Sequence, residues 1–287
     1  MKAGLGTVQL GLDYGISNSG GQTPIEEARR ILKLASEEGF EYLDTAAQYG
    51  ESERVIGQIL GQKHSFKIIT KTPPLTPANT EQDLQQGFAR SLELLQVASV
   101  YGLMVHRFDD LKECKGLIDA MRDIKASGRV RRIGVSVYTN AQALECLDLP
   151  ELELIQVPLN AFDQELVISG TLDRLKQKGF EIHARSIFLQ GLLLMDPETA
   201  HQFFDPIRDH LRNYHLQMKA AGLSALEGAV QFVRSLANVD CAVFGVNTLD
   251  QLREIGAALK KNISPIDFTR FAIADRSFLN PALWRLK

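Results

Sequence analysis

Four side chains in the first half of the chain could together move a proton: Asp44, Tyr49, Lys71 and His106. A phenol has a pKa of about 10, which is too high for efficient acid–base work at neutral pH. A nearby ammonium favours the phenolate and lowers that pKa, and a carboxylate paired with the ammonium keeps it charged and in place. An imidazole beside the phenol can donate to a substrate oxygen. The set is therefore suited to protonating an alkoxide as it forms.

Taken one at a time, these residues have ordinary structural explanations. An aspartate often caps a turn, a tyrosine often packs with its hydroxyl in water, and a histidine after an apolar run is commonly a core residue. Lys71 could also form a Schiff base, as in a barrel aldolase. The proton-transfer interpretation therefore requires all four side chains to meet at one place.

The elements around the four residues predict such a meeting. Each residue follows a short apolar segment with the character of a buried strand, and the carboxyl ends of parallel strands meet at one rim. The segments are Tyr42-Leu43 before Asp44 and Tyr49, Lys67–Thr70 before Lys71, and Val100–Val105 before His106.

Strand and helix patterns alternate along the whole chain with a period of roughly 30 residues. The expected strands are Gly4–Gly11, Tyr42-Leu43, Lys67–Thr70, Val100–Val105, Arg132–Ser136, Leu154–Val157, Glu181–Ser186 and Asp240–Gly245. The expected helices are one from a cap at Thr23 to Gly39, one from Ser52 to Gly61, and Glu81–Leu95, Leu111–Ser127, Ala141–Leu147, Leu166–Lys178, Pro206–Ala221, Ser224–Ala237 and Leu249–Leu259. Eight such units predict an α/β protein, a (β/α)8 TIM barrel, with residues 1–287 as a single domain.

Composition excludes several function classes. The chain has 287 residues, 45% of them apolar and 23% charged, and a net charge of -3, so nothing points to nucleic acid or to a membrane surface. Cys114, Cys146 and Cys241 are too few and too far apart for a disulfide framework, and the pair His210 and His215 lacks a third metal ligand. We expect a cytoplasmic protein without a metal site.

The stretch Asp44-Thr45-Ala46-x-x-Tyr49-Gly50-x-Ser52-Glu53 resembles the first signature of the aldo-keto reductase family, and the resemblance extends over nearly the whole chain. It implies a barrel oxidoreductase that reduces a small carbonyl compound. Tyr49 would be the general acid–base, Lys71 would lower its pKa, Asp44 would pair with Lys71, and His106 would orient the carbonyl. Some members of the family are sensors with little turnover, and that alternative stays open.

The resemblance also implies a nicotinamide cofactor, NADP(H) or possibly NAD(H). Ser136 and Gln156 would bind its carboxamide, and Arg185 stands where many members stack an aromatic ring on the nicotinamide. The loop from Phe188 to Gly191 would follow the pyrophosphate. The expected cofactor contacts are Thr7, Ser136, Gln156, Arg185, Ser186, Phe188, Gln190, Gly191, Gly245, Asn247, Gln251 and Arg253.

The chain departs from the family pattern after the last expected strand. Asn247 stands where a cation usually binds the 2′-phosphate of NADP(H), and Ile255 stands where an Asn usually meets the adenine. An Asn lacks the charge-assisted hydrogen bonds of an Arg. We therefore expect only a modest preference for NADP(H), with Arg253 reaching back to compensate. No pattern indicates a particular carbonyl substrate or an oligomeric state.

Overall fold

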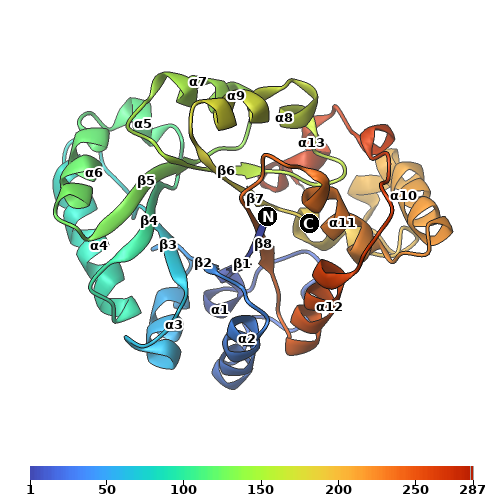
Figure 1. Cartoon of the computed structure of the whole chain (residues 1–287), viewed down its shortest axis with the longest axis horizontal. Helices are drawn as coiled ribbons and strands as arrows, with labels where there is room; N and C mark the ends of the chain where they lie inside the picture. The colour runs from blue at the N-terminus through green and yellow to red at the C-terminus, as the bar shows by residue number, and fades with distance from the viewer. Residues whose placement is uncertain (285, 287) are drawn as a thin grey trace.

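Eight parallel strands close on themselves in chain order in the computed structural model, which describes residues 1–284 and 286 (Figure 1). The ring closes where β1 pairs with β8, from Lys2 opposite Cys241 to Gly6 opposite Gly245. The strands are β1 Lys2–Gly6, β2 Tyr42–Asp44, β3 Lys67–Lys71, β4 Val100–Val105, β5 Val130–Ser136, β6 Leu154–Pro158, β7 Glu181–Arg185 and β8 Cys241–Gly245. The expected (β/α)8 barrel is confirmed.

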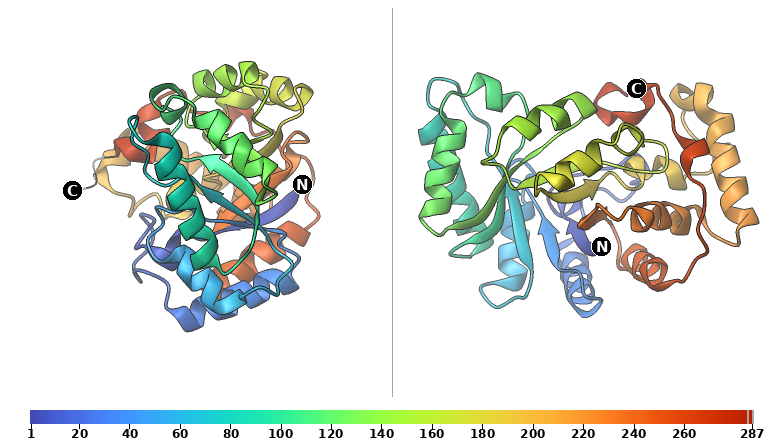
Figure 2. Two further views of the ribbon diagram at one scale, coloured as in Figure 1. Left: turned by 90° about the vertical axis from the view of Figure 1, so that its left-hand side faces the viewer. Right: turned by 45° about the horizontal axis from the view of Figure 1, so that its top comes forward.

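Helices surround the barrel on its outer side (Figures 1 and 2). The α-helices are α1 Val8–Gly11, α2 Ile25–Glu37, α3 Ser52–Leu60, α4 Thr80–Leu95, α5 Asp110–Glu113, α6 Leu117–Ala126, α7 Asn140–Glu145, α8 Glu165–Ile168, α9 Thr171–Gln177, α10 Arg208–Ala220, α11 Ala225–Ser235, α12 Leu249–Lys260 and α13 Arg276–Leu279. The 3-10 helices are η1 Cys146–Asp148, η2 Leu189–Leu194, η3 Gln202–Ile207, η4 Thr269–Phe271 and η5 Pro281–Leu283. In the part of the chain that the structure describes, no helix has the length and apolarity needed to cross a bilayer.

Two expected helices are each broken in two by a glycine. The expected helix Leu111–Ser127 divides into α5 and α6 at Gly116, which has φ +78°, and Leu166–Lys178 divides into α8 and α9 at Gly170, which has φ +71°. Glycine enters this left-handed region without a steric cost, so it turns the chain while the apolar pattern continues across the turn. The prediction of one continuous helix in each place is wrong.

The first strand and the first long helix also begin and end differently from the prediction. The strand expected over Gly4–Gly11 ends at Gly6, and the remaining residues form the short helix α1. Thr23 does not cap α2. Its hydroxyl donates instead to the backbone oxygen of Asn247, at 3.3 Å, and so ties the start of α2 to the loop after β8.

The core has two parts. The larger lies between the strands and the helices, where the apolar faces of α2, α4, α6 and α11 pack on the barrel. The smaller fills the barrel itself, where alternate strand residues point inward. Its members are Tyr42, Ile69, Met104, Leu154, Cys241 and Val243.

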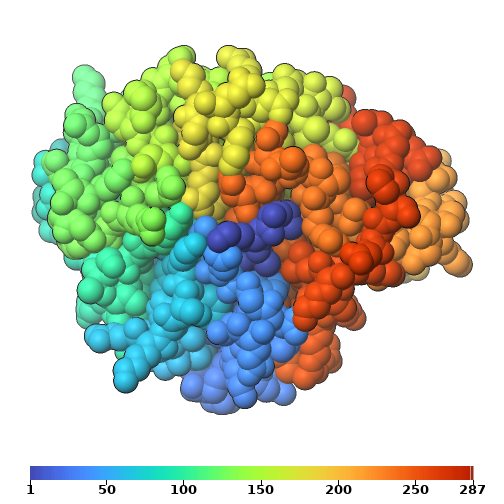
Figure 3. Space-filling view, viewed as in Figure 1, coloured from blue at the N-terminus to red at the C-terminus, as the bar shows by residue number. Residues whose placement is uncertain are grey.

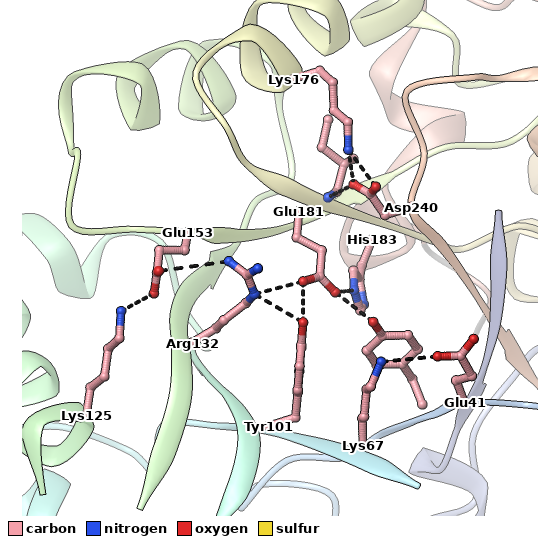
Figure 4. Close-up of polar contacts among 12 residues, drawn as sticks. Glu41, Lys67, Tyr101, Lys125, Arg132, Glu153, Lys176, Glu181, His183 and Asp240 are labelled. Carbon is pink, nitrogen blue, oxygen red and sulfur yellow. Dashed lines mark hydrogen bonds and ion pairs between the residues drawn. The ribbon is translucent and has the colours of Figure 1, made fainter. Parts of the chain in front are cut away.

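The amino ends of the strands are closed by a polar network around Glu181 (Figure 4). Its carboxylate accepts hydrogen bonds from Tyr42 at 2.9 Å and Tyr101 at 2.5 Å, pairs with Arg132 at 3.0 Å, and contacts His183 at 2.9 Å. Burial alone would raise the pKa of Glu181, but the hydrogen bonds from His183, Tyr101 and Tyr42 lower it to about 2. This end of the barrel is therefore stabilised by a carboxylate that stays ionised.

The first residues of the chain and the segment around helix α13 lie on opposite sides of the molecule. Figure 3 shows the first residues, in dark blue, at the centre of one face, and the left panel of Figure 2 places the C-terminal segment on the other side. The C-terminal segment thus reaches the carboxyl ends of the strands, where Asn280 and Ala282 line a cavity. The tail therefore folds over the mouth of the barrel.

Candidate active site

A cavity of about 550 Å³ opens at the carboxyl ends of the strands. Its wall includes all four proton-transfer candidates, Asp44, Tyr49, Lys71 and His106. It also includes every expected cofactor contact except Arg253. The barrel thus brings together residues that are far apart in the sequence, because successive strands deliver their ends to one rim.

Lys71 and Asp44 form a buried ion pair at the floor of this cavity. The Lys71 ammonium donates to the two Asp44 carboxylate oxygens at 2.8 and 2.9 Å and to the backbone oxygen of Thr45 at 2.9 Å. Burial alone would lower the pKa of Lys71, but the charge and hydrogen bonds of Asp44, together with Tyr49, raise it above the ordinary value. The lysine is therefore a fixed ammonium.

Tyr49 lies directly beside that ammonium. Lys71 Nζ is 3.3 Å from the Tyr49 hydroxyl and 4.8 Å from the centre of its ring. Burial raises the pKa of Tyr49, while the Lys71 charge works to lower it. Lys71 therefore lowers the pKa of Tyr49, as expected, but burial of the phenol raises it by more.

The residues around Tyr49 hold its loop against the end of β1. The Ser52 hydroxyl, at the start of α3, donates to the backbone oxygen of Thr7 at 2.9 Å and lies 2.9 Å from the Thr7 hydroxyl. A Cβ on Gly11 would come within 1.8 Å of the Tyr49 backbone oxygen, so only glycine allows this approach. Helix α1 and the start of α3 therefore fix where Tyr49 lies.

Glu53 performs a second structural task within the same stretch. It is 2% exposed and accepts a hydrogen bond of 2.6 Å from the Thr70 hydroxyl on β3. Burial raises the pKa of its carboxyl, and the hydrogen bond from Thr70 acts against that rise. The bond ties α3 to the strand that ends at Lys71. Ser52 and Glu53 thus position the two residues that do the proposed chemistry.

His106 faces Tyr49 across the cavity. The two ring centres are 5.7 Å apart and the rings are nearly perpendicular, at 83°. Burial, assisted by the positive charge of Lys71, lowers the pKa of His106 to about 4. At neutral pH the imidazole is therefore uncharged, and one ring nitrogen carries a hydrogen that can be donated to a substrate oxygen.

Gln156 fits a carboxamide ligand. Its side-chain amide donates to Asp44 Oδ1 at 2.7 Å, while its own amide oxygen is buried and has no hydrogen-bond partner in the described structure. Ser136, its neighbour across the β5–β6 pairing, is 2% exposed and lines the same cavity. A buried acceptor without a partner is costly. A ligand amide next to Gln156 would satisfy it, as the nicotinamide carboxamide does in the expected arrangement.

The segment after β7 has an unusual backbone. Ser186, Leu189 and Gln190 have φ values of 58°, 48° and 53°, and Gly191 has φ 97°. Left-handed backbone at residues other than glycine costs free energy and often marks a ligand site. A Cβ on Gly191 would lie 2.1 Å from the Ser17 hydroxyl, so the loop after β1 packs closely on this segment. Both line the cavity, as does Phe188.

The segment after β8 forms another part of the cavity wall. The backbone N–H of Asn247 donates to the Gln251 side chain at 2.7 Å, and Gly245 lines the cavity beside them. Arg253 is off the cavity: its guanidinium contacts Asp250 at 2.7 Å on the exposed side of α12. The Asp250 carboxylate, one turn earlier on the helix, therefore holds the Arg253 guanidinium away from the cofactor phosphate that it was expected to reach.

Sequence reasoning missed several lining residues, among them Gln9, Tyr14, Glu254 and Asn280. The glycine-rich loop after β1 gave a usable signal for Tyr14, whose hydroxyl accepts from the Gln190 side chain at 3.0 Å. Nothing in the pattern of the tail indicated that Asn280 reaches the mouth of the barrel.

The other histidines are used structurally. A ring nitrogen of His210 lies 2.8 Å from the Phe271 backbone oxygen, and one of His215 lies 2.9 Å from that of Leu193. Among the described residues no group of His, Cys, Asp and Glu side chains is arranged to hold a metal ion. The three cysteines are free and buried.

Comparison with known proteins gives consistent results. A family model described as the aldo/keto reductase family matches residues 2–276. The oxidoreductase YdhF of Escherichia coli (strain K12) is 31% identical over 153 residues, which are 53% of this chain and 49% of YdhF. The 6-dehydroglucose reductase of Novosphingobium aromaticivorans is 28% identical over 197 residues, which are 63% of this chain and 64% of that protein. The chain thus spans less than two thirds of the length of either relative.

Solved structures show the same fold. The aldo-keto reductase AKR11C1 from Bacillus halodurans, in its holo form, superimposes with a TM-score of 0.79 at 19% identity, over 96% of this chain and 93% of that one. The glycerol dehydrogenase AKR11B4 from Gluconobacter oxydans gives a TM-score of 0.72 at 19% identity, over 93% and 89% of the two chains.

Proposed function

Because this chain belongs to the aldo/keto reductase family, we propose that it reduces an aldehyde or ketone to an alcohol with a nicotinamide cofactor, and that Tyr49 is the general acid. The observation that carries the proposal is the Tyr49–Lys71 contact of 3.3 Å at the floor of a cavity that also holds His106. A bound nicotinamide supplies the hydride. The protein's part is to bind the carbonyl and deliver a proton to its oxygen.

The proposed roles follow from the contacts. The Tyr49 hydroxyl and a neutral His106 ring nitrogen both donate to the carbonyl oxygen and polarise it. As the oxygen gains negative charge, the Tyr49 proton moves to it, and the resulting phenolate is stabilised by the fixed ammonium of Lys71. Asp44 keeps Lys71 charged and, through Gln156, connects the ion pair to the proposed carboxamide site.

The proposed cofactor contacts are the expected residues that line the cavity, Arg185 apart, from Thr7 and Ser136 to Gln251. NADP(H) is the family expectation, and NAD(H) fits the same wall. No lysine or arginine among the described residues 245–255 lines the cavity, because Arg253 lies outside it. We therefore propose a weak preference between the two dinucleotides, without a role for Arg253.

A spectrophotometric assay tests this function. NADPH or NADH oxidation is followed with a panel of small aldehydes and ketones, and cofactor binding is measured separately by fluorescence. Turnover that depends on the carbonyl compound supports a reductase. Tight cofactor binding with negligible turnover across the panel would instead indicate a sensor.

The aldolase alternative has its own test. A Schiff base requires a neutral amine, whereas Lys71 is held as an ammonium by Asp44 and Thr45. Treatment with borohydride in the presence of a carbonyl compound should therefore leave Lys71 unmodified, as read by mass spectrometry of the proteolytic peptide that contains Lys71. A trapped adduct on Lys71 would refute the proposed role of this residue.

A further inference from the structure

Arg185 is a cation in the cavity wall that forms no ion pair with a carboxylate of the described residues. Its guanidinium donates to the Ser186 hydroxyl at 3.1 Å and to the backbone oxygen of Val137 at 3.0 Å, both uncharged acceptors. A guanidinium has five N–H donors, so three remain for a ligand. Lys71, the other cation among the described lining residues, is already neutralised by Asp44.

The surroundings hold Arg185 in place without providing an anion. The guanidinium lies over the ring of Tyr138, 4.3 Å from the ring centre. Arg276 of α13 fixes the Tyr138 backbone by donating to its carbonyl oxygen at 2.6 Å, and Arg276 also takes the nearby carboxylate of Asp163 at 3.0 Å. The acid that could have balanced Arg185 is therefore already paired with another cation.

The position of Arg185 is close to the reacting end of the cavity. It ends β7, next to Ser186, and its charge is near enough to lower the pKa of both Tyr49 and His106. Tyr138, on which it lies, also lines a neighbouring cavity of about 320 Å³ together with His106 and Gln48. A ligand whose carbonyl lies between Tyr49 and His106 can therefore place a second group at Arg185.

We propose that Arg185 binds an oxyanion of the carbonyl substrate, so that the substrates are oxo acids bearing a carboxylate or phosphate rather than neutral aldehydes or ketones. The inference rests on the reductase function proposed above and specifies its substrate class. Half-buried cations bind oxyanions strongly, because a guanidinium donates two parallel, charge-assisted hydrogen bonds to a carboxylate. The other source of an oxyanion in this cavity is the cofactor diphosphate, and the experiment distinguishes the two.

The kinetic test compares substrates of equal length with and without the charge. Each ω-oxo acid of two to six carbons is paired with the n-alkanal of the same length, and kcat/KM is measured at saturating cofactor. For the wild-type protein, we expect kcat/KM for the best acid to exceed that for its alkanal by at least tenfold, because hydrogen bonds to charged groups are stronger than those between neutral groups. In Arg185→Met this ratio should fall to near one, and Arg185→Lys should retain part of it.

A binding measurement covers the case in which no panel compound is reduced. Glutarate and its diamide have no reducible carbonyl, and their binding to the cofactor-loaded protein is measured by calorimetry. Glutarate should bind to the wild type at least tenfold more tightly than the diamide does, and Arg185→Met should abolish the difference. The proposal is overturned if glutarate shows no such advantage, or if Arg185→Met weakens cofactor binding while leaving the acid-to-alkanal ratio unchanged. Glutarate binding without any turnover would count against the reductase function alone.

Discussion

Replacing Lys71 by Met removes the charge that opposes the effect of burial on Tyr49. With Nζ 3.3 Å from the phenol oxygen, the lost attraction to a phenolate is about 5 kcal/mol at an effective dielectric constant of about 20. The Asp44 carboxylate acts in the opposite direction, so part of this is cancelled when its charge is lost as well, either by protonation of the unpaired acid or by substitution. Taking roughly half, we expect the phenolate to be destabilised by about 2 to 3 kcal/mol, which raises the pKa of Tyr49 further.

The same substitution leaves Asp44 buried without its cation, and such a loss costs about 3 to 5 kcal/mol of stability. A second variant, Lys71→Met with Asp44→Asn, removes both charges and preserves the volume of the site. It serves as the matched control, because it retains the altered environment of Tyr49 while avoiding an unpaired carboxylate.

The assay is the pH dependence of kcat/KM for oxidation of an alcohol, the direction in which Tyr49 must be deprotonated. Activity should rise with pH in the wild type, and in both variants the rise should move to higher pH while the rate at pH 7 falls. A profile of unchanged shape, merely scaled down, would mean that Lys71 does not tune Tyr49.

Three further predictions concern other parts of the molecule. Because the pKa of His106 is about 4, the pH profile of kcat/KM for carbonyl reduction should show no inflection between pH 6 and 7. An inflection in that range that is absent from His106→Gln would contradict a neutral imidazole. The pKa of Glu181 is lowered from 4.5 to about 2, so its stabilising effect is complete above pH 4.5 and is lost as the pH falls toward 2. The difference in unfolding free energy between wild type and Glu181→Gln, from urea titrations, should shrink by about 2 kcal/mol between pH 6 and pH 3, and a constant difference would refute the assignment. Asn247→Arg should tighten NADPH binding at least tenfold and change NADH binding little. Arg253→Ala should leave the dissociation constants of both NADPH and NADH unchanged. A selective loss of NADPH affinity in Arg253→Ala would show that Arg253 does reach the cofactor.

The meeting of Asp44, Tyr49, Lys71 and His106 could be predicted from the sequence because it depends only on the topology. Each residue ends a strand or follows one, and a parallel barrel brings all such ends to one rim. The predicted strands therefore locate the site, even though Gly4–Gly11 was extended too far. The helices between the strands were harder to delimit, because single glycines can interrupt them. At Gly116 the expected helix is broken although the apolar pattern continues across it.

Side-chain partners were harder to predict than positions. Arg253 could reach toward the cavity or toward Asp250, and the choice rests on a local ion pair that spacing alone leaves undecided. Similarly, alternation along β7 indicates that Glu181 and His183 share a face, but it does not reveal that Tyr42 and Tyr101 complete a network with Glu181. The tail carried no periodicity, so its approach to the mouth of the barrel was found only in the structure.

The central claim is that the Tyr49 hydroxyl delivers the proton to the carbonyl oxygen, and Tyr49→Phe tests it most directly. The measurement is single-turnover oxidation of the bound dinucleotide by a carbonyl substrate, alongside the cofactor dissociation constant from fluorescence. We expect the rate to fall by about 10² to 10⁴, the usual loss for a positioned acid, with the dissociation constant nearly unchanged. Wild-type turnover in Tyr49→Phe would contradict the account.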